Sequence, residues 1–219
     1  MTGNKHITVC GDSFCSYETD CKERHFSQIL KEDYGYRVVN IAKQGCSQTM
    51  IGFQVQEALS RYHSDVIIHN QTFPDRIDVK LDKDFSSFSH SLDSFVYDRP
   101  QEASTQVRSE YKNATIRSCN ISSLNGWPKD MHELTVRYLT EVTDYYVREH
   151  QTQWIYEYWH MKIKESGRIS IPLLRDTQPG KLLYDFCDNG RIDYPTPFHT
   201  DEATQHLVAE QIDKIIKSC

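Results

Sequence analysis

Gly11-Asp12-Ser13 lies close to the N-terminus, directly after the short apolar run from Ile7 to Cys10, whose β-branched residues favour a buried strand. In open α/β sheets, ligands bind outside the carboxyl ends of the strands. Ser13 therefore lies where its hydroxyl could attack an ester, provided that a base removes its proton. Gly-Asp-Ser is also an ordinary turn sequence, so the tripeptide alone leaves both interpretations open.

A second candidate for chemistry is His199, at the other end of the chain. It stands in a loop that contains Pro195 and Pro197, immediately before a predicted helix over Thr200 to Lys217. Thr200 is a natural N-cap for that helix, and acidic residues in the first turn favour the helix dipole. We therefore expect His199 to be held in the loop and not on the apolar face of the helix.

The chain contains seven cysteines, an odd number that fits free thiols better than a disulfide framework. Cys10, Cys15, Cys21 and His25 could suggest zinc, but their spacing is not a usual ligand spacing, and we predict no metal. Cysteine chemistry through Cys10, Cys15 or Cys46 is a further hypothesis. Small buried cysteines are also common core residues.

Apolar periodicity predicts alternating strands and helices in the first third of the chain. After the first strand, the pattern favours elements at His25–Leu30 (helix), Tyr36–Ala42 (strand), Met50–Tyr62 (helix) and Asp65–His69 (strand). This alternation is typical of right-handed βαβ units and a parallel sheet. We predict one domain over 1–219, with an irregular insertion at about 79–128 that either covers the site or awaits a partner.

The second half of the chain is predicted to be mostly helical. A helix over Asp130–Glu165 should bend, break or leave the core at 148–153. Its aromatic residues are expected to pack in the core, with a platform for a sugar as the alternative. Ile169–Leu174 is a possible fourth strand, which Pro172 limits to an edge or a strand end. The stretch 177–193 is polar and turn-rich.

Composition excludes several classes of function. The net charge is −6 without a dense Lys/Arg block, so nucleic acid is not an expected partner. No run approaches the roughly 20 apolar residues that span a bilayer, so no membrane partner is expected. The N-terminus shows no signal peptide, which predicts a cytoplasmic protein.

Taken together, these motifs resemble the SGNH hydrolases, also called the GDSL lipase/esterase family. The resemblance implies a three-layer α/β/α sandwich with a mostly parallel, flavodoxin-like sheet. Gly11-Asp12-Ser13 matches the nucleophile block, the stretch Val39–Ser47 resembles the block with an oxyanion-hole glycine at Gly45, and Phe198–Ala203 resembles the block with the catalytic His199. The resemblance thus implies Ser13 as the nucleophile, His199 as the base, and the N–H groups of Ser13 and Gly45 as oxyanion donors.

Two positions depart from the family pattern. The family's third block carries an Asn after the third strand, and Asn70 is the candidate here, with Gln71 or Thr72 as alternatives for the oxyanion hole. The family's acid normally lies three residues before the histidine, where this chain has Thr196. Asp193 is the nearest upstream carboxylate; otherwise a Ser-His dyad would operate.

The resemblance implies an esterase or carbohydrate O-deacetylase that works through an acyl-enzyme and needs no cofactor. Its substrate would be a small-molecule or carbohydrate ester, and a long-chain lipid is less favoured. Short members of this kind occur in phages, where the protein could be virion-associated. The alternative is a catalytically weak or inactive binding or structural module, with 79–128 as its interaction surface. The oligomeric state is not predicted.

Overall fold

The computed structural model describes residues 5–16, 23–43, 46–74, 76–81, 115–119, 129–188 and 200–219. In chain order its elements are β1 (His6–Cys10), α1 (Phe26–Glu32), β2 (Arg37–Asn40), α2 (Gln48–Ser60), β3 (Val66–Asn70), β4 (Ile77–Leu81), β5 (Thr115–Cys119), α4 (Lys129–Arg137), the π-helix η3 (Tyr138–Val142), α5 (Tyr145–Glu165), β6 (Ile169–Leu173), α6 (Gln178–Asp188) and α7 (Glu202–Ser218).

Four of the strands form a parallel sheet in the order β2-β1-β3-β6. This is the beginning of the flavodoxin-like strand order, in which the connections change direction between the first and third strands. Val9 pairs with Asn40 on one side and Ile68 on the other, so the three strands end at one edge. Pro172 lies in the edge strand β6, as predicted.

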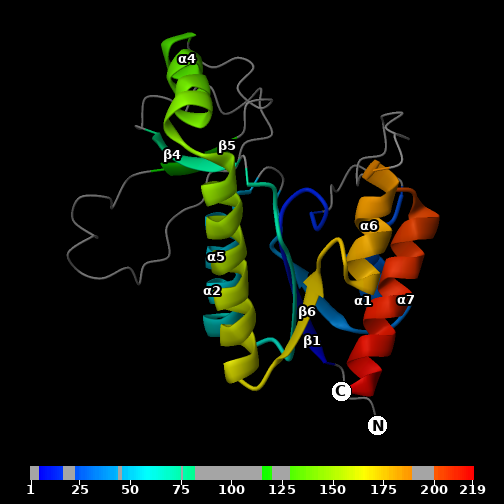
Figure 1. The fold of residues 1–219 in the computed structure, drawn as a ribbon. Coiled ribbons are helices and arrows are strands. Elements are labelled where there is room, and N and C mark those ends of the chain that lie inside the picture. The colour runs from blue at the N-terminus through cyan, green and yellow to red at the C-terminus, as the bar shows by residue number, and fades with distance from the viewer. Residues whose placement is uncertain are drawn as a thin grey trace.

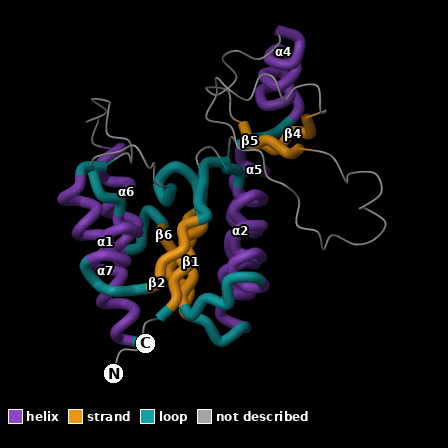
Figure 2. The backbone as a smooth tube through the Cα atoms, turned by 180° about the vertical axis from the view of Figure 1, so that it is seen from behind, coloured by secondary structure: helices purple, strands orange, loops and turns teal. Residues whose placement is uncertain are grey.

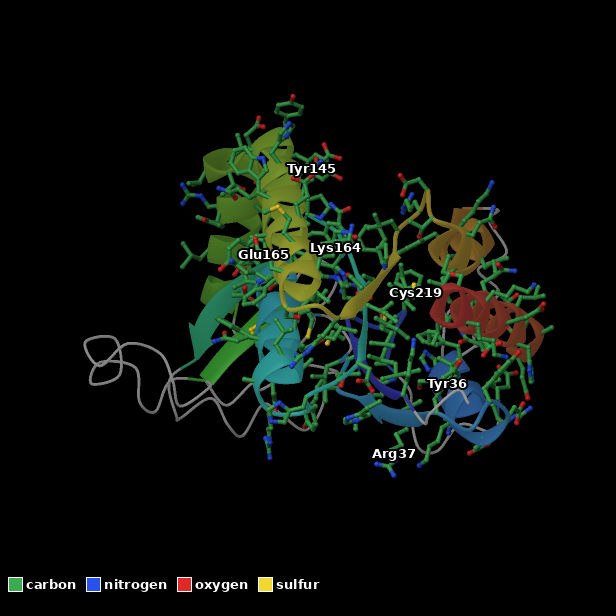
Figure 3. All side chains as sticks on the ribbon, turned by 90° about the horizontal axis from the view of Figure 1, so that it is seen from below. Tyr36, Arg37, Tyr145, Lys164, Glu165 and Cys219 are labelled. Atoms are coloured by element: carbon green, nitrogen blue, oxygen red, sulfur yellow. The ribbon has the colours of Figure 1, made fainter. Side chains whose placement is uncertain are left out.

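Helices cover both faces of this sheet (Figure 1). Because side chains alternate along a strand, Ile7 and Val9 enter the core beneath α1, α6 and α7, whereas Cys10 and Ile67 face α2 and α5. Figure 3 shows the same division: Tyr36 and Cys219 lie on the side of α1 and α7, opposite α5. The predicted three-layer α/β/α architecture is confirmed.

The two helices α2 and α5 approach each other closely at Gly52. A Cβ atom there would collide with the indole of Trp159, reaching within 2.8 Å of Cδ1. The missing side chain of Gly52 therefore allows α5 to pack on α2, and α5 in turn covers β3 and β6.

Part of the predicted insertion contains a small antiparallel pair. β4 and β5 are joined with Ile77 opposite Cys119, although the sequence predicted no clear elements there. With α4 they lie at one end of α5, beyond the sheet (Figure 2). Residues 82–114 and 120–128 lie outside the described residues, so an insertion within a single domain stays a prediction.

The helical region between 129 and 165 differs from the prediction. The chain breaks at Thr143, which is extended (ψ 139°), and α5 then runs without interruption through 148–153. Asp144 caps α5 by accepting a hydrogen bond from the Val147 N–H at 3.1 Å. The expected burial of the aromatic residues was also partly wrong, because Tyr146 and Trp154 are about two-thirds exposed.

Two further predictions about the C-terminal third need correction. Gln178–Asp188 forms α6, where only a polar, turn-rich stretch was expected. The N-cap of α7 is Asp201 and not Thr200, because the Asp201 carboxylate accepts the Thr204 N–H at 2.8 Å. In the part of the chain that the structure describes, none of the helices has the length and apolar character to cross a bilayer.

Candidate active site

Ser13 lies in a tight turn that begins where β1 ends. The Asp12 carbonyl accepts the N–H groups of Cys15 at 3.0 Å and Ser16 at 2.9 Å, which closes the turn. Gly11 enters it with φ +152°, and a Cβ there would collide with Asn70 and lie 2.7 Å from Cys15. Ser13 is partly exposed, and among the described residues neither its hydroxyl nor its N–H has a hydrogen-bond partner.

The Asp12 carboxylate holds this turn against β3 and the chain that follows it. Asp12 is fully buried. A carboxylate is stable in the interior only when its oxygens accept hydrogen bonds or pair with a cation. It accepts hydrogen bonds from the Phe14 N–H (3.1 Å), Asn70 Nδ2 (2.8 Å), Thr72 Oγ1 (2.7 Å) and Arg76 Nη1 (2.8 Å). The side chain beside Ser13 is therefore a structural anchor for the candidate nucleophile.

Asn70 ends β3 and touches the same turn. Its Oδ1 accepts the Asp12 N–H at 3.2 Å, and its Nδ2 donates to Asp12 Oδ1 at 2.8 Å and to the Tyr184 hydroxyl at 3.2 Å. The Tyr184 hydroxyl donates to the Gln71 carbonyl at 3.1 Å, and burial together with the Asp12 charge raises the pKa of Tyr184. Both N–H bonds of the Asn70 amide are thus directed at internal partners. Its role as an oxyanion donor stays a prediction.

The alternatives to Asn70 are placed close by. Thr72 uses its hydroxyl for Asp12, and its N–H donates to Gln48 Oε1 at 3.0 Å. Gln71 lines a neighbouring cavity. Thr72 lines the same cavity, but its hydroxyl is committed to Asp12.

Gly45 lies outside the described residues, but the chain on both sides of it contacts the Ser13 turn. Before it, the Lys43 N–H donates to the Gly11 carbonyl at 2.9 Å. After it, the Cys46 carbonyl accepts Arg76 Nη1 at 3.0 Å, the same nitrogen that binds Asp12. The described residues on either side of Gly45 are therefore linked to the Ser13 turn, directly at Lys43 and through Arg76 at Cys46.

His199 and Asp193 also lie outside the described residues. The neighbouring residue Thr200 is fully buried at the start of α7, and its Oγ1 accepts Gln205 Nε2 at 2.5 Å. Gln205 Oε1 in turn accepts the Phe26 N–H at 2.8 Å, which ties the start of α7 to the start of α1.

The start of α1 is tied to the Ser13 turn directly and through Asn40, at the end of β2. His25 Nε2 lies 3.5 Å from the Phe14 carbonyl, and Asn40 Nδ2 donates both to the Cys15 carbonyl at 2.8 Å and to Ser27 Oγ at 3.1 Å. The beginnings of α1 and α7 and the end of β1 therefore meet in one buried network. The residue that follows His199 belongs to it.

The histidine and cysteines near the site are buried and perform structural roles. His25 caps α1 by accepting the Ser27 N–H at 3.2 Å, and burial lowers its pKa to about 3, so the imidazole is neutral. Burial raises the pKa of Cys10 and Cys15 well above the usual range, whereas a nucleophilic cysteine must be a thiolate. Among the described residues no three potential metal ligands lie together; Cys21 is not among them.

A cavity of about 640 Å³ opens at the carboxyl ends of β3 and β6. Its walls include Gln71, Thr72 and Tyr184, which connect it to the Asp12 network. The Arg175 guanidinium lies 5.6 Å from the Phe73 ring and 5.4 Å from the Tyr184 ring. Aromatic rings and polar groups thus alternate beside the site.

Arg76 and Tyr184 were not predicted to belong to the site, and Thr72 was predicted only as an alternative oxyanion donor and not as a partner of Asp12. Each contacts Asp12 or Asn70 only because β1, β3 and α6 come together in the fold. No local motif around these residues indicates that contact.

Comparison with known proteins leaves the family open. The chain matches no family model, and no curated protein matches it. A solved structure from Desulfitobacterium hafniense DCB-2, assigned to the G-D-S-L family of lipolytic proteins, aligns with a TM-score of 0.38 and 10% identity over 94% of this chain and 99% of that chain. A similarity at this level does not carry function, which has to be argued from the residues of the site.

Proposed function

We propose that this protein is a serine hydrolase that cleaves ester bonds with Ser13 as its nucleophile. The proposal rests on a difference in hydrogen bonding between Ser13 and the other groups of its turn. The groups around Ser13 are bonded to the fold, whereas its own hydroxyl and N–H have no partner among the described residues. The turn lies where the sheet's connections change direction, the usual ligand position in this architecture.

In the proposed reaction, His199 accepts the hydroxyl proton while Ser13 Oγ attacks the ester carbonyl carbon. The N–H groups of Ser13 and Gly45 stabilise the resulting oxyanion. The C–O bond to the alcohol then breaks, the alcohol takes the proton from His199, and an acyl-enzyme remains. Water activated by His199 attacks the acyl group and releases the acid. Asp193 orients the imidazole, or the pair works as a dyad.

Asn70 is the proposed third oxyanion donor, and this role requires a change in the hydrogen bonds of its amide group. One of its two N–H bonds, to Asp12 or to Tyr184, must be exchanged for the substrate oxygen. The Tyr184 contact at 3.2 Å is the longer of the two and is the one we expect to yield. Gln71, which lines the cavity, is the alternative donor.

The proposed substrate is a small-molecule or carbohydrate ester. The cavity beside the Asp12 network combines the rings of Phe73, Tyr156 and Tyr184 with polar side chains such as Gln71 and Arg175. Rings of this kind stack on the apolar faces of a sugar, and polar groups at the rim hydrogen-bond to hydroxyls.

Hydrolysis of p-nitrophenyl acetate by wild type and by Ser13→Ala tests the proposal. Ser16→Ala is the matched control, because Ser16 belongs to the same turn and, among the described residues, its hydroxyl makes only a 3.5 Å contact with the Ser13 carbonyl. We expect Ser13→Ala and His199→Ala to lose about 10³-fold or more in kcat, and Ser16→Ala to keep nearly all activity. Equal, slow hydrolysis by wild type and Ser13→Ala would refute the proposal.

A second candidate is a binding module that retains the fold without turnover. The engagement of both Asn70 N–H bonds favours it, because a working oxyanion hole needs donors that point at the substrate in advance. Under this hypothesis, a carbohydrate ester binds to wild type and Ser13→Ala with equal affinity and is recovered uncleaved from both.

A further inference from the structure

A second cavity, of about 810 Å³, lies on the α2 and α5 side of the molecule and does not include Ser13. It is open to solvent on one side and is lined by the start of α2, the connection from β3 to β4, the end of α4, and the junction of η3 with α5. Much of its wall is apolar, formed by Leu134, Tyr138, Val142, Val147 and Ile155. Its size and character are those of a small-molecule site.

Arg148, in the first turns of α5, lines this cavity with unsatisfied donors. Its Nε and Nη1 are buried and have no hydrogen-bond partner among the described residues. Its guanidinium carbon lies 5.9 Å from the Tyr145 ring, a contact that occupies a face of the group and leaves the N–H donors at its edge. A buried guanidinium is always charged and is unfavourable without an anionic or hydrogen-bonding partner.

Two more buried polar atoms without partners belong to residues of the same cavity. They are Thr143 Oγ1, at the break between η3 and α5, and Arg76 Nε. The Arg76 side chain is only 9% exposed, and its Nη1 is committed to Asp12 and the Cys46 carbonyl. Unsatisfied buried donors from three residues therefore line one cavity.

Two carboxylates, Asp144 and Asp78, also line the cavity, and each keeps its negative charge while it accepts hydrogen bonds from neutral groups. Asp144 accepts the Val147 N–H as the N-cap of α5. Both oxygens of Asp78 lie 2.7 Å from the Ser47 hydroxyl. Arg148 Nε and Nη1 can only donate, so a ligand group that faces them has to be a hydrogen-bond acceptor, and a carboxylate is the acceptor that also carries the opposite charge.

We propose that this cavity binds an organic anion, a carboxylate carried on an apolar body. The carboxylate accepts hydrogen bonds from Arg148 and Thr143, and the apolar body packs against the walls formed by η3 and α5. Guanidinium groups bind carboxylates by charge-assisted hydrogen bonds, which are stronger than neutral ones. The site is separate from the Ser13 chemistry, so Ser13→Ala should bind the anion as wild type does.

Isothermal titration of the full chain with octanoate, 4-phenylbutyrate and the neutral analogue 1-octanol tests this proposal. We expect at least one of the two carboxylates to bind one per chain and more tightly than octanol. Arg148→Gln should weaken carboxylate binding about tenfold or more and leave octanol unchanged, and Thr143→Val should weaken it about threefold or more. Arg61→Gln is the matched control, since Arg61 is 72% exposed and lies outside the cavity.

Thermal unfolding separates binding from a structural role for Arg148. Without added carboxylate, Arg148→Gln should unfold at the wild-type temperature or above it, because an unpaired buried charge is removed. The carboxylate should raise the Tm of wild type only. The proposal is overturned if neither carboxylate binds saturably, if octanol binds equally well, or if Arg148→Gln binds the carboxylate unchanged. It is also overturned if Arg148→Gln lowers the Tm and no carboxylate raises that of wild type.

Discussion

Asp12→Asn is the substitution that most directly tests how the Ser13 turn is held. It keeps the size of the side chain and removes its charge. Oδ1 faces the donors Phe14 N–H and Asn70 Nδ2, and Oδ2 faces Thr72 Oγ1 and Arg76 Nη1. In either orientation the new NH₂ group would point at a nitrogen donor that cannot accept.

The magnitude follows from burial. Asp12 is fully buried and the Arg76 side chain is 9% exposed, so the substitution leaves an uncompensated guanidinium in the interior. Breaking a buried pair in this way costs about 3–5 kcal/mol of the free energy of unfolding. In a protein of this size that corresponds to a fall in Tm of about 10 °C. The activity attributed to Ser13 should be lost as well.

Urea and thermal unfolding measure this cost, with Asp33→Asn as the matched control. Asp33 pairs with Arg24 at 2.9 Å, but both side chains are more than one-third exposed, so its loss should cost no more than about 1 kcal/mol. In a double-mutant cycle, Arg76→Gln should recover part of the loss caused by Asp12→Asn. The reasoning is refuted if Asp12→Asn costs no more than Asp33→Asn, or if the cycle gives no coupling.

Three other predictions concern the core. Burial lowers the pKa of His25 and of His69 to about 3, so between pH 6.5 and 3 the unfolded chain binds protons that the folded chain does not. As the pH is lowered through this range, the free energy of unfolding should fall by about 1.4 kcal/mol per pH unit for each histidine. Urea unfolding at several pH values should show a weaker dependence of this free energy on pH for His69→Gln than for wild type. Burial raises the pKa of Cys46 to about 12, so iodoacetamide should not alkylate this thiol in the native protein at pH 8. Alkylation of Cys46 before denaturation would contradict this prediction, because it would show that the thiol is accessible. Gly52→Ala should lower the free energy of unfolding by about 1–3 kcal/mol and change the tryptophan emission spectrum, because the new methyl group meets the Trp159 indole. An unchanged spectrum and an unchanged Tm would contradict the close packing of α2 on α5.

The two central strands could be predicted because each is a continuous, largely β-branched run that is buried on both faces, as Val66–Asn70 illustrates. The boundaries of the helices were harder to predict. The polar stretch at 148–153 suggested a break, but polar residues on the outer face do not interrupt a helix, and Asp144 sets the real boundary. In α6, Pro179 lies in the first turn, a position typical of a helix start, but the many polar and turn-forming residues around it favour a loop in the sequence pattern.

The site was predictable only where the chemistry is local. Ser13 follows a strand and a glycine, which a sequence displays directly. The role of Asp12 as a buried anchor depends on Thr72 and Arg76, which are some 60 residues away and reach it only through the pairing of β1 with β3. The unsatisfied donors of Arg148 likewise depend on how α5 packs, so no spacing rule reveals them.

Fluorophosphonate labelling of the native protein, followed by mapping of the modified residue, tests the central claim most directly. Our account predicts a single adduct on Ser13 that is absent from Ser13→Ala, strongly reduced in His199→Ala and retained in Ser16→Ala. Modification at another residue, or equal labelling of wild type and Ser13→Ala, would contradict it.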